Sequence, residues 1–361
     1  MADKYDLVIL GSTASARLLA LSLTRIHKAR ILLIIDPEQP HRLFATPQTS
    51  AGFCTSAAFF ERTAESAATA QQLLATLDAE LLVHTKPTAI FTQFPQHMPM
   101  LEFTEGAAIH AGVVCERRIH PETQTEQLVF PDSLSFEVSN IIQACDAHNS
   151  EAGEYTILSR ADLTKSHITK DGRFTGRTED RSLKAGKVLL LDPDLIAEQM
   201  SESPSNSLLL AQVHNIIRFS KLKQLPFAAQ QDISTGLWQF ETSATDFIFS
   251  APAPMDQLTT HLFKHHNDVA DRRVRQLDHC TELSSVDGYL VCDALGMRNT
   301  ICFAGAQHFD LALMPELANH ISNLLSGAQT NKDSFWQNAK IGRKRGGEGT
   351  LLRVGSAGSN E

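Results

Sequence analysis

The first 36 residues constrain the fold more than any other part of the chain. Residues 5–10, YDLVIL, form a short apolar run that predicts a buried strand, and Gly11 ends it. Residues 14–26, ASARLLALSLTRI, combine strong helix formers with apolar side chains on nearly all sides, which is typical of a helix packed on a sheet. Residues 29–36, ARILLIID, predict a second buried strand. Strand, glycine turn, helix and strand make a βαβ unit with a right-handed crossover, so the chain begins as an α/β protein.

The turn of this unit is a modified dinucleotide-binding fingerprint. In G-x-G-x-x-G, the first glycine makes the tight turn, the second lets the backbone approach a pyrophosphate, and the third permits close helix–strand packing. Those positions are Gly11, Thr13 and Ala16 here, and alanine is tolerated at the third. Thr13 places a β-branched side chain where a phosphate oxygen would pass, while nearby hydroxyls and the helix N-terminus offer compensating donors. The residues predicted to contact the phosphates are Gly11, Ser12, Thr13, Ala14, Ser15 and Ala16.

Asp36 supplies the second half of the signature. It ends the second strand 20 residues after Ala16, where an acidic side chain accepts hydrogen bonds from the ribose hydroxyls of an adenosine. An acid at this position disfavours a 2′-phosphate, so NADP is the least expected dinucleotide. The alternative is an ordinary α/β turn with Asp36 solvated at a strand end, and both interpretations stay open at this point.

The pattern changes twice along the rest of the chain. Residues 57–78 predict an alanine-rich amphipathic helix, and residues 80–180 contain shorter β-like runs separated by polar turns, typical of antiparallel strands. The α/β pattern then returns, with Asp192 as the expected N-cap of a helix. The last α/β segment, 299–327, predicts a strand, a glycine loop and a helix that starts near Pro315. Beyond residue 328 the chain is polar and glycine-rich, which predicts a flexible tail over 329–361.

Composition and charge exclude several classes of function. The formal net charge of −9 argues against a nucleic-acid partner or an anionic membrane surface. No apolar run approaches the ~18–20 residues of a membrane span. The six cysteines stand singly, without metal-type spacing, which predicts reduced thiols and no metal site. The N-terminal residues show no signal-peptide pattern, so a cytoplasmic location is expected.

Four segments, taken in order, carry a resemblance to a known family. They are the N-terminal βαβ unit, KVLLLDPDLIAEQM with SLLLAQVHNIIRF, TDFIFSAPAP, and SSVDGYLVCDALGMRNTICFAGAQHFDLALMPELANHISNLLSG. In this order they resemble the FAD-dependent oxidoreductases of the glutathione-reductase-like fold, most of all the D-amino-acid-oxidase and glycine-oxidase type. The resemblance covers roughly residues 5–80, 185–252 and 284–328, through weak motifs.

The resemblance implies an α/β architecture of two domains. A Rossmann-like FAD-binding domain, with a parallel sheet and helices, would be built from residues 1–80, 185–219 and 245–328. A mainly antiparallel substrate domain would be inserted between these segments, from residues 81–184 and 220–244.

The resemblance also implies contacts to the flavin half of FAD. Reduced flavin carries negative charge near N1 and O2, and the positive end of a helix dipole stabilises it. The backbone of Leu313 and Met314 is expected at that helix end, after a glycine loop with Gly305 and Ala306. His308 follows this loop and would serve as a base or orienting group, or as a structural side chain. A small-residue loop beside the flavin would contribute Ser50, Ala51 and Gly52.

The expected function is that of an FAD-dependent oxidoreductase acting on a small molecule. The bond oxidised would be a C–N bond of an amine or amino acid, or the reduced flavin would use oxygen. Two alternatives remain at this point. The first is an accessory protein that keeps the fold without turnover, which the missing glycines favour; the second is a maturation flavoprotein that modifies a partner peptide or protein.

Overall fold

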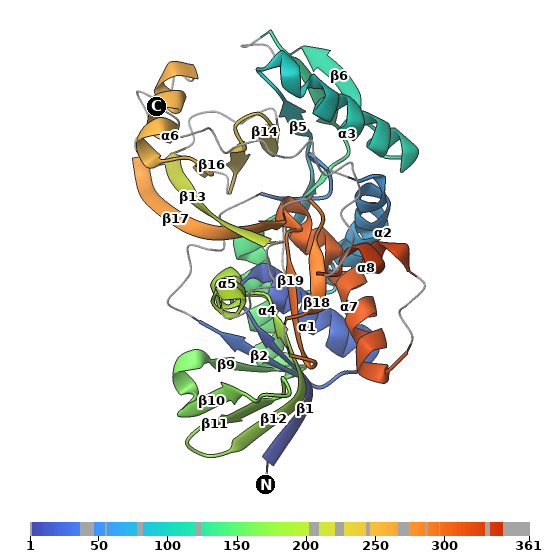
Figure 1. Ribbon diagram of the computed structural model, residues 1–361, viewed down its shortest axis with the longest axis vertical. Coiled ribbons are helices and arrows are strands. Elements are labelled where there is room, and N and C mark those ends of the chain that lie inside the picture. Colours follow the sequence, from blue (N-terminus) through green and yellow to red (C-terminus); the bar gives the residue numbers. More distant parts are fainter. Residues whose placement is uncertain are drawn as a thin grey trace.

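The computed structural model describes residues 2–36, 47–54, 56–77, 82–119, 124–201, 209–220, 227–242, 246–265, 274–285, 288–295, 297–328 and 333–341. Most of its strands fall into two large sheets, one at each end of the long axis, with helices beside them (Figure 1). These observations confirm an α/β fold that combines a parallel sheet with a largely antiparallel one.

The first sheet is built around the N-terminal strand β1. Its parallel core has the order β9-β2-β1-β12-β19, with β18 antiparallel to β19 and the β10–β11 hairpin antiparallel to the first half of β12. The strands are β1 (Ala2–Leu10), β2 (Ile31–Ile35), β9 (Thr156–Ser159), β10 (Lys165–Ile168), β11 (Phe174–Arg177), β12 (Ser182–Leu190), β18 (Val291–Ala294) and β19 (Thr300–Ala304). The expected βαβ unit is confirmed, because β1 and β2 are adjacent and parallel.

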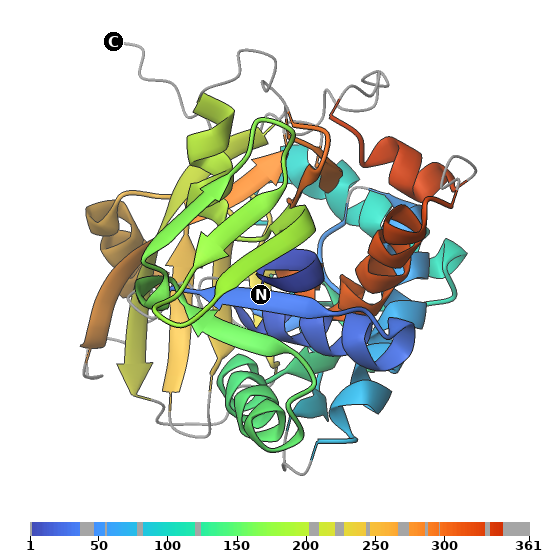
Figure 2. The ribbon, with the colours of Figure 1, turned by 90° about the horizontal axis from the view of Figure 1, so that it is seen from below.

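Four helices build the apolar layer beside this sheet. α1 (Ala14–His27) joins β1 to β2 and packs against α7 (Asp310–Ser326) and α4 (Val138–Ala152), while α7 also packs against α2 (Ala57–Leu74). Figure 2 shows α1 and α7 together on one side of β1. Leucines of α1 and α7 join those of β1 in one buried cluster. Burial of this kind contributes about 1.5–3 kcal/mol per large apolar side chain, which explains why the apolar N-terminal pattern predicts its fold well.

The second sheet has eight strands in the order β17-β13-β16-β15-β14-β5-β7-β6. All neighbours are antiparallel except β14 and β5. Its strands are β5 (Thr88–Phe91), β6 (Glu116–Ile119), β7 (Glu126–Phe130), β13 (Leu209–Ser220), β14 (Ala229–Asp232), β15 (Leu237–Glu241), β16 (Asp246–Ala251) and β17 (Val274–Ser285). β17 reaches back to contact β19 and α5, so it links the two sheets (Figure 1).

The remaining elements are short. A three-stranded sheet has the order β3-β8-β4. These elements are β3 (Gln48–Thr49), β4 (Val83–Thr85), β8 (Leu134–Phe136), α3 (Met98–His110), α5 (Pro193–Ser201), α6 (Met255–His265), α8 (Ser334–Asn338) and the 3-10 turns Pro95–His97, Arg160–Asp162 and Gln307–Phe309. Among the described residues, no helix is long and apolar enough to cross a membrane.

The strand pairing divides the chain at other places than the expected domain boundaries. β9, β10 and β11 lie within residues 81–184 but pair in the first sheet, around β1. β13 and β16 were expected in the FAD-binding domain, but they pair in the second sheet. Short apolar strands look alike in sequence whichever sheet they join, because hydrophobic periodicity reports burial and not the partner strand.

Two further expectations need correction near the C-terminus. α7 starts at Asp310, and Pro315 lies inside it rather than at its first turn. The expected flexible tail contains α8, whose Trp336 is buried and stacks on His320 with ring centroids 4.1 Å apart. Residues 329–332 and 342–361 of that expected tail lie outside the described residues.

Candidate functional site

The glycine turn after β1 is packed tightly against β12. A Cβ on Gly11 would lie 3.0 Å from Cβ of Leu191, at the end of β12, and 3.4 Å from Cβ of Ala16. The Gly11 N–H donates to the carbonyl of Ile34. Gly11 is therefore required because two neighbouring chain segments approach its backbone closely.

Ser12 ties this turn to the end of β2. Its Oγ accepts a hydrogen bond from the Asp36 N–H at 2.7 Å and donates to the Asp36 carbonyl at 3.1 Å. The Ser12 hydroxyl therefore binds protein backbone, whereas the sequence suggested a phosphate donor. The same pair of hydrogen bonds fixes Asp36 beside the turn, where the acidic half of the signature belongs.

Thr13 caps its own helix. Its backbone is extended, and its Oγ1 accepts a hydrogen bond from the Ala16 N–H at 3.3 Å. This is the usual arrangement of a threonine N-cap, and it satisfies one of the free N–H groups that a phosphate would otherwise use. Threonine in place of glycine at position 13 therefore has two effects. It adds a side chain at the turn, and its hydroxyl accepts the hydrogen bond of the Ala16 N–H.

Arg17 is a buried cation behind the turn that the sequence analysis missed. Its side chain is 6% exposed, and its Nη1 donates to the carbonyl of Ser12 at 2.8 Å. Its Nε and Nη2 bind the two carboxylate oxygens of Asp146, on α4, at 2.8 and 2.9 Å. The available signal was one charged residue within the otherwise apolar run ASARLLALSL.

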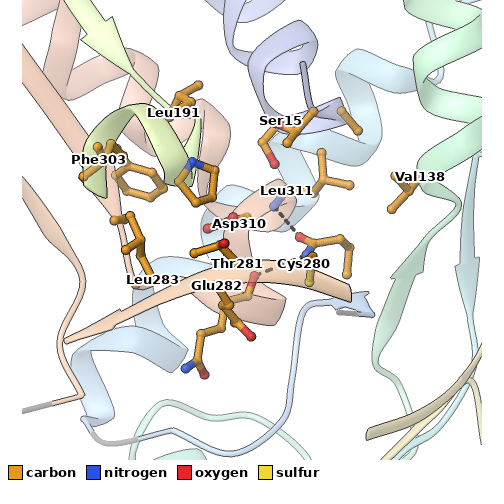
Figure 3. Close-up of a pocket in the computed structure, with 18 residues that line it drawn as sticks. Ser15, Val138, Leu191, Cys280, Thr281, Glu282, Leu283, Phe303, Asp310 and Leu311 are labelled. Carbon is orange, nitrogen blue, oxygen red and sulfur yellow. Dashed lines mark hydrogen bonds between the residues drawn. The ribbon is translucent and has the colours of Figure 1, made fainter. Parts of the chain in front are cut away.

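Two cavities lie on either side of this turn. The larger, about 220 Å³, is lined by Gly11, Ser12 and Asp36 together with α5 and the β10–β11 hairpin. The smaller, about 100 Å³, is lined by Thr13, Ala14, Ser15 and Gly305, together with residues of β17 and α7 (Figure 3). The predicted N-terminal residues and Gly305 are thus brought together, although they are far apart in sequence.

Several predicted residues line neither cavity within the described chain. Ala16 and Ala306 are buried in the core. Ser50 binds Leu134, with its Oγ accepting from the Leu134 N–H at 2.8 Å. Ala51 is buried in the apolar cluster, and Gly52 faces His308.

The N-terminus of α7 differs from the expected flavin contact. Leu313 and Met314 are fully buried inside the helix, because α7 begins at Asp310. The Leu311 N–H points instead to the Gln48 side chain, whose Oε1 accepts it at 3.0 Å. Gln48 thus caps α7 from a distant part of the chain. The expected start of the helix near Pro315 is wrong, while the flavin contact of Leu313 and Met314 remains a prediction.

His308 is a neutral side chain in the core. It is 1% exposed, and its ring lies between Phe309 and Trp238, with centroids 3.9 and 5.0 Å away. Both ring nitrogens lack a hydrogen-bond partner in the described chain, and burial lowers the pKa of His308 to about 3. A Cβ on Gly52 would lie 2.5 Å from its Nε2. The predicted catalytic role of His308 remains a prediction, since His308 lines neither cavity described above.

A group of polar side chains from three strands meets beside the smaller cavity. Glu282 of β17 lines the cavity, and its Oε2 lies 2.9 Å from Nε2 of His214 on β13. Nδ1 of the same histidine lies 3.4 Å from Oγ of Ser250 on β16. His214 and Ser250 are buried, and the Glu282 side chain is 14% exposed. No local sequence motif predicts this group, because only strand pairing brings the three residues together.

Asp310 faces the same cavity from the first residue of α7. Burial, and to a smaller extent the charge of Glu282, raises the pKa of Asp310 to about 7. Figure 3 labels both acids among the side chains around the cavity. The described residues contain no group of three or more His, Cys, Asp or Glu side chains that could hold a metal ion.

Comparisons with known proteins give a fold match without a sequence match. No family model matches the sequence, and no curated protein does. L-proline dehydrogenase from P. horikoshii superposes with a TM-score of 0.71 at 10% identity, covering 94% of this chain and 98% of that one. L-amino acid deaminase from Proteus vulgaris, with its specific insertion sequence deleted, gives 0.72 at 12% identity, covering 95% of each chain. Glycine oxidase from Bacillus cereus gives 0.68 at 11% identity, covering 94% and 99%. The chain therefore has the fold of these amino-acid oxidoreductases over nearly its whole length.

Proposed function

We propose that this protein is an FAD-dependent oxidoreductase that oxidises a C–N bond of an amine or an amino acid. The fold supports the reaction class, because the similar structures are named as enzymes that act on L-proline, glycine and L-amino acids. A likeness of fold does not by itself assign an activity. The proposal therefore depends on the chemistry of the site.

The two cavities on either side of the Gly11–Ser15 turn carry the proposal. A dinucleotide has two halves joined by a pyrophosphate, and the turn between the cavities lies at the N-terminus of α1, where anions are stabilised. Asp36, on the wall of the larger cavity, suits the ribose hydroxyls of an adenosine. The buried guanidinium of Arg17, which is paired with Asp146, donates to the Ser12 carbonyl and so holds the turn in place. These residues fit the adenosine and pyrophosphate of FAD.

The smaller cavity would then hold the reacting end of the cofactor and the substrate. FAD, when bound, supplies the two-electron acceptor. Leu191, Phe303 and Leu311 give this cavity part of its apolar wall. Glu282 and Asp310 are its acids, and Glu282 is held in place by His214.

The test starts from the purified protein and its absorbance at about 350–500 nm, before and after added FAD. Bound flavin that bleaches on anaerobic mixing with an amine or an amino acid supports the proposal. A protein that takes up no flavin overturns it, and so does bound flavin that no member of a broad panel reduces.

A matched pair of variants tests the cofactor site directly. Asp36→Asn is expected to weaken FAD binding about tenfold, since a hydrogen bond to a charged group is worth about 1.5–3 kcal/mol. Asp132→Asn, on an exposed turn, is the control and should bind FAD as the unchanged protein does. Equal affinities of the Asp36→Asn variant and the unchanged protein would contradict the assignment of Asp36.

One observation favours a second candidate, a protein of this fold without turnover. Two N–H groups that a flavin cofactor would use are already bound within the chain, Ala16 by Thr13 and Leu311 by Gln48. This candidate predicts a colourless protein that gains no flavin, so the same absorbance measurement separates the two.

A further inference from the structure

The cavity beside α7 has an acidic wall. Glu282 enters it from β17 and Asp310 from the start of α7. The Asp310 side chain has no hydrogen bond or ion pair within the described chain, although burial and the Glu282 charge hold its pKa at about 7. An acid with no partner in the described chain, placed on the wall of an open cavity, is a group that a ligand can satisfy.

Glu282 is held in one orientation by a chain of polar contacts. His214 lies 2.9 Å from its Oε2, and Ser250 lies 3.4 Å from the other ring nitrogen of His214. Both supporting residues are buried on β13 and β16, so the carboxylate is fixed from the sheet side. A preorganised carboxylate of this kind binds a cation without first losing the freedom of its own side chain.

Among the described residues that line it, the cavity offers no lysine or arginine to an acidic ligand. Its described lining consists of Thr13, Ala14, Ser15, Gln48, Val138, Leu191, Pro193, Ile196, Cys280, Thr281, Glu282, Leu283, Phe303, Ala304, Gly305, Gln307, Asp310 and Leu311. No lysine or arginine occurs among these residues, whereas a carboxylate ligand is usually held by an arginine fork. A second carboxylate brought in by a substrate would be repelled by Glu282.

We propose that this cavity takes a small amine that carries no α-carboxylate, with its ammonium group on Glu282. This inference rests on the proposed function and narrows its substrate from amines and amino acids to amines. Oxidation of R–CH₂–NH₃⁺ to the iminium R–CH=NH₂⁺ releases one hydride equivalent and one proton. FAD, when bound, would supply the acceptor for the hydride, and the Glu282 carboxylate would take the proton, so atoms and charge balance. His214 acts through Glu282 as a positioning residue.

The test compares compounds that differ only by a carboxylate. n-Propylamine is paired with 2-aminobutyrate, and pyrrolidine with proline, each amino acid as both enantiomers. Dissociation constants come from calorimetry on the protein with and without FAD, and flavin reduction is followed anaerobically in parallel. Each amine is expected to bind at least about tenfold more tightly than its amino acid.

Variants of Glu282 and of a matched exposed acid test whether the amine binds at Glu282. Glu282→Gln keeps the shape and removes the charge, and it is expected to weaken amine binding at least about tenfold. Glu102→Gln makes the same change on an exposed face of α3 and should leave the binding constant unchanged. If Glu282→Gln binds n-propylamine as tightly as the unchanged protein, the inference fails.

The role of His214 needs a readout that a merely structural role would not move. His214→Leu removes the contact to Glu282, so its amine affinity should fall towards that of Glu282→Gln. His214→Gln keeps a side-chain N–H for the same carboxylate and is expected to restore the affinity to within about threefold. Equal losses in both variants, with unchanged circular dichroism, would show that His214 does not act through Glu282.

The outcomes separate this inference from the proposed function. Bound flavin together with a preference for proline or 2-aminobutyrate over its matched amine overturns the inference and leaves the oxidoreductase in place. If the protein binds no flavin, the proposed oxidoreductase function is overturned. The dissociation constants of each amine and its matched amino acid, measured by calorimetry, still decide which of the two ligands the cavity binds.

Discussion

Two helices of this protein begin at the same edge of the first sheet, and their N-termini differ in charge. α1 follows β1 and Gly11, whereas α7 follows β19 and Gly305. The start of α1 has a buried arginine behind it, and its amide is capped locally by Thr13. The start of α7 carries the acid Asp310, which is partly exposed to the cavity, and its amide is capped by Gln48 from far away in the sequence. The charge of Arg17 behind α1 is therefore balanced by Asp146, whereas the acid at the start of α7 has no ion-pair partner in the described chain and suits a cation or a proton.

The acid at the start of α7 shows which physical effect dominates there. A helix N-terminus stabilises a carboxylate by about 0.3–1 kcal/mol, and by about 2 kcal/mol at most. Yet the pKa of Asp310 is raised to about 7, chiefly by burial. A helix N-terminus can therefore lie beside either charge, because the surrounding side chains, rather than the helix dipole, decide which charge is favoured there.

The largest effect is expected when the acid of α7 is neutralised. The folded-state pKa of Asp310 lies above its value in the unfolded chain, so its contribution to stability is present below about pH 4 and is lost as pH rises through about 7. Up to about 4 kcal/mol of the free energy of unfolding should disappear over that range. Asp310→Asn should remove this loss in urea unfolding at several pH values. Asp132→Asn serves as the control, and parallel curves for Asp310→Asn and the unchanged protein would contradict the prediction.

The next effect is expected when the cation behind α1 is removed. Arg17→Leu leaves the partly exposed Asp146 and the Ser12 carbonyl without a partner, which should cost about 1–3 kcal/mol in urea unfolding. Arg118→Leu breaks an exposed pair with Glu116 and should cost less than about 1 kcal/mol. If the two variants lose similar amounts of unfolding free energy, the burial of Arg17 does not add to the stability of the fold.

Close packing around His308 gives an effect of intermediate size. In Gly52→Ala the new Cβ would meet the imidazole, which predicts a loss of about 1–3 kcal/mol of folding stability. Gly106→Ala, inside α3 with nothing within 4 Å, should instead stabilise by about 0.5–1 kcal/mol. Thermal unfolding of both variants checks the opposite signs, and two shifts of the same sign would refute the packing of His308 against Gly52.

The smallest change in stability is expected at Thr13, and it tests whether the N-terminus of α1, unlike that of α7, binds an anion. Thr13→Gly loses the cap hydrogen bond to Ala16, at a cost of only a few tenths of a kcal/mol, and frees that N–H for a phosphate. FAD affinity should therefore rise while stability falls slightly. Thr13→Ser keeps the cap and is the control. An FAD affinity that does not change in Thr13→Gly would show that this turn does not hold the pyrophosphate.

The sequence predicts those features that depend on neighbouring residues. The βαβ unit, the helix α2, the N-cap of Asp192, whose Oδ1 accepts from the Asp194 N–H, and the end of α7 at Gly327 are all confirmed. Each follows from a local apolar pattern or from the backbone preference of one residue.

The rest of the site depends on contacts that no local pattern encodes. His214, Ser250 and Glu282 lie on three strands, and only the register of β13 against β16 and β17 brings them together. The start of α7 was misplaced because Pro315 resembles a first-turn proline, while a glutamine more than 260 residues earlier provides the actual cap. Such residues become visible only once the strands are paired.

The position of β1 in the middle of the first sheet has a consequence for synthesis on the ribosome. One edge of β1 pairs early with β2, but its other edge pairs with β12, which leaves the ribosome about 170 residues later. At about 5–20 residues per second, that edge stays open for roughly 10–35 s. The first half of β1 carries three charged residues, Asp3, Lys4 and Asp6. Charges on an open strand edge oppose pairing with other chains, so these three residues are expected to reduce misassociation of the nascent chain before its sheet is complete.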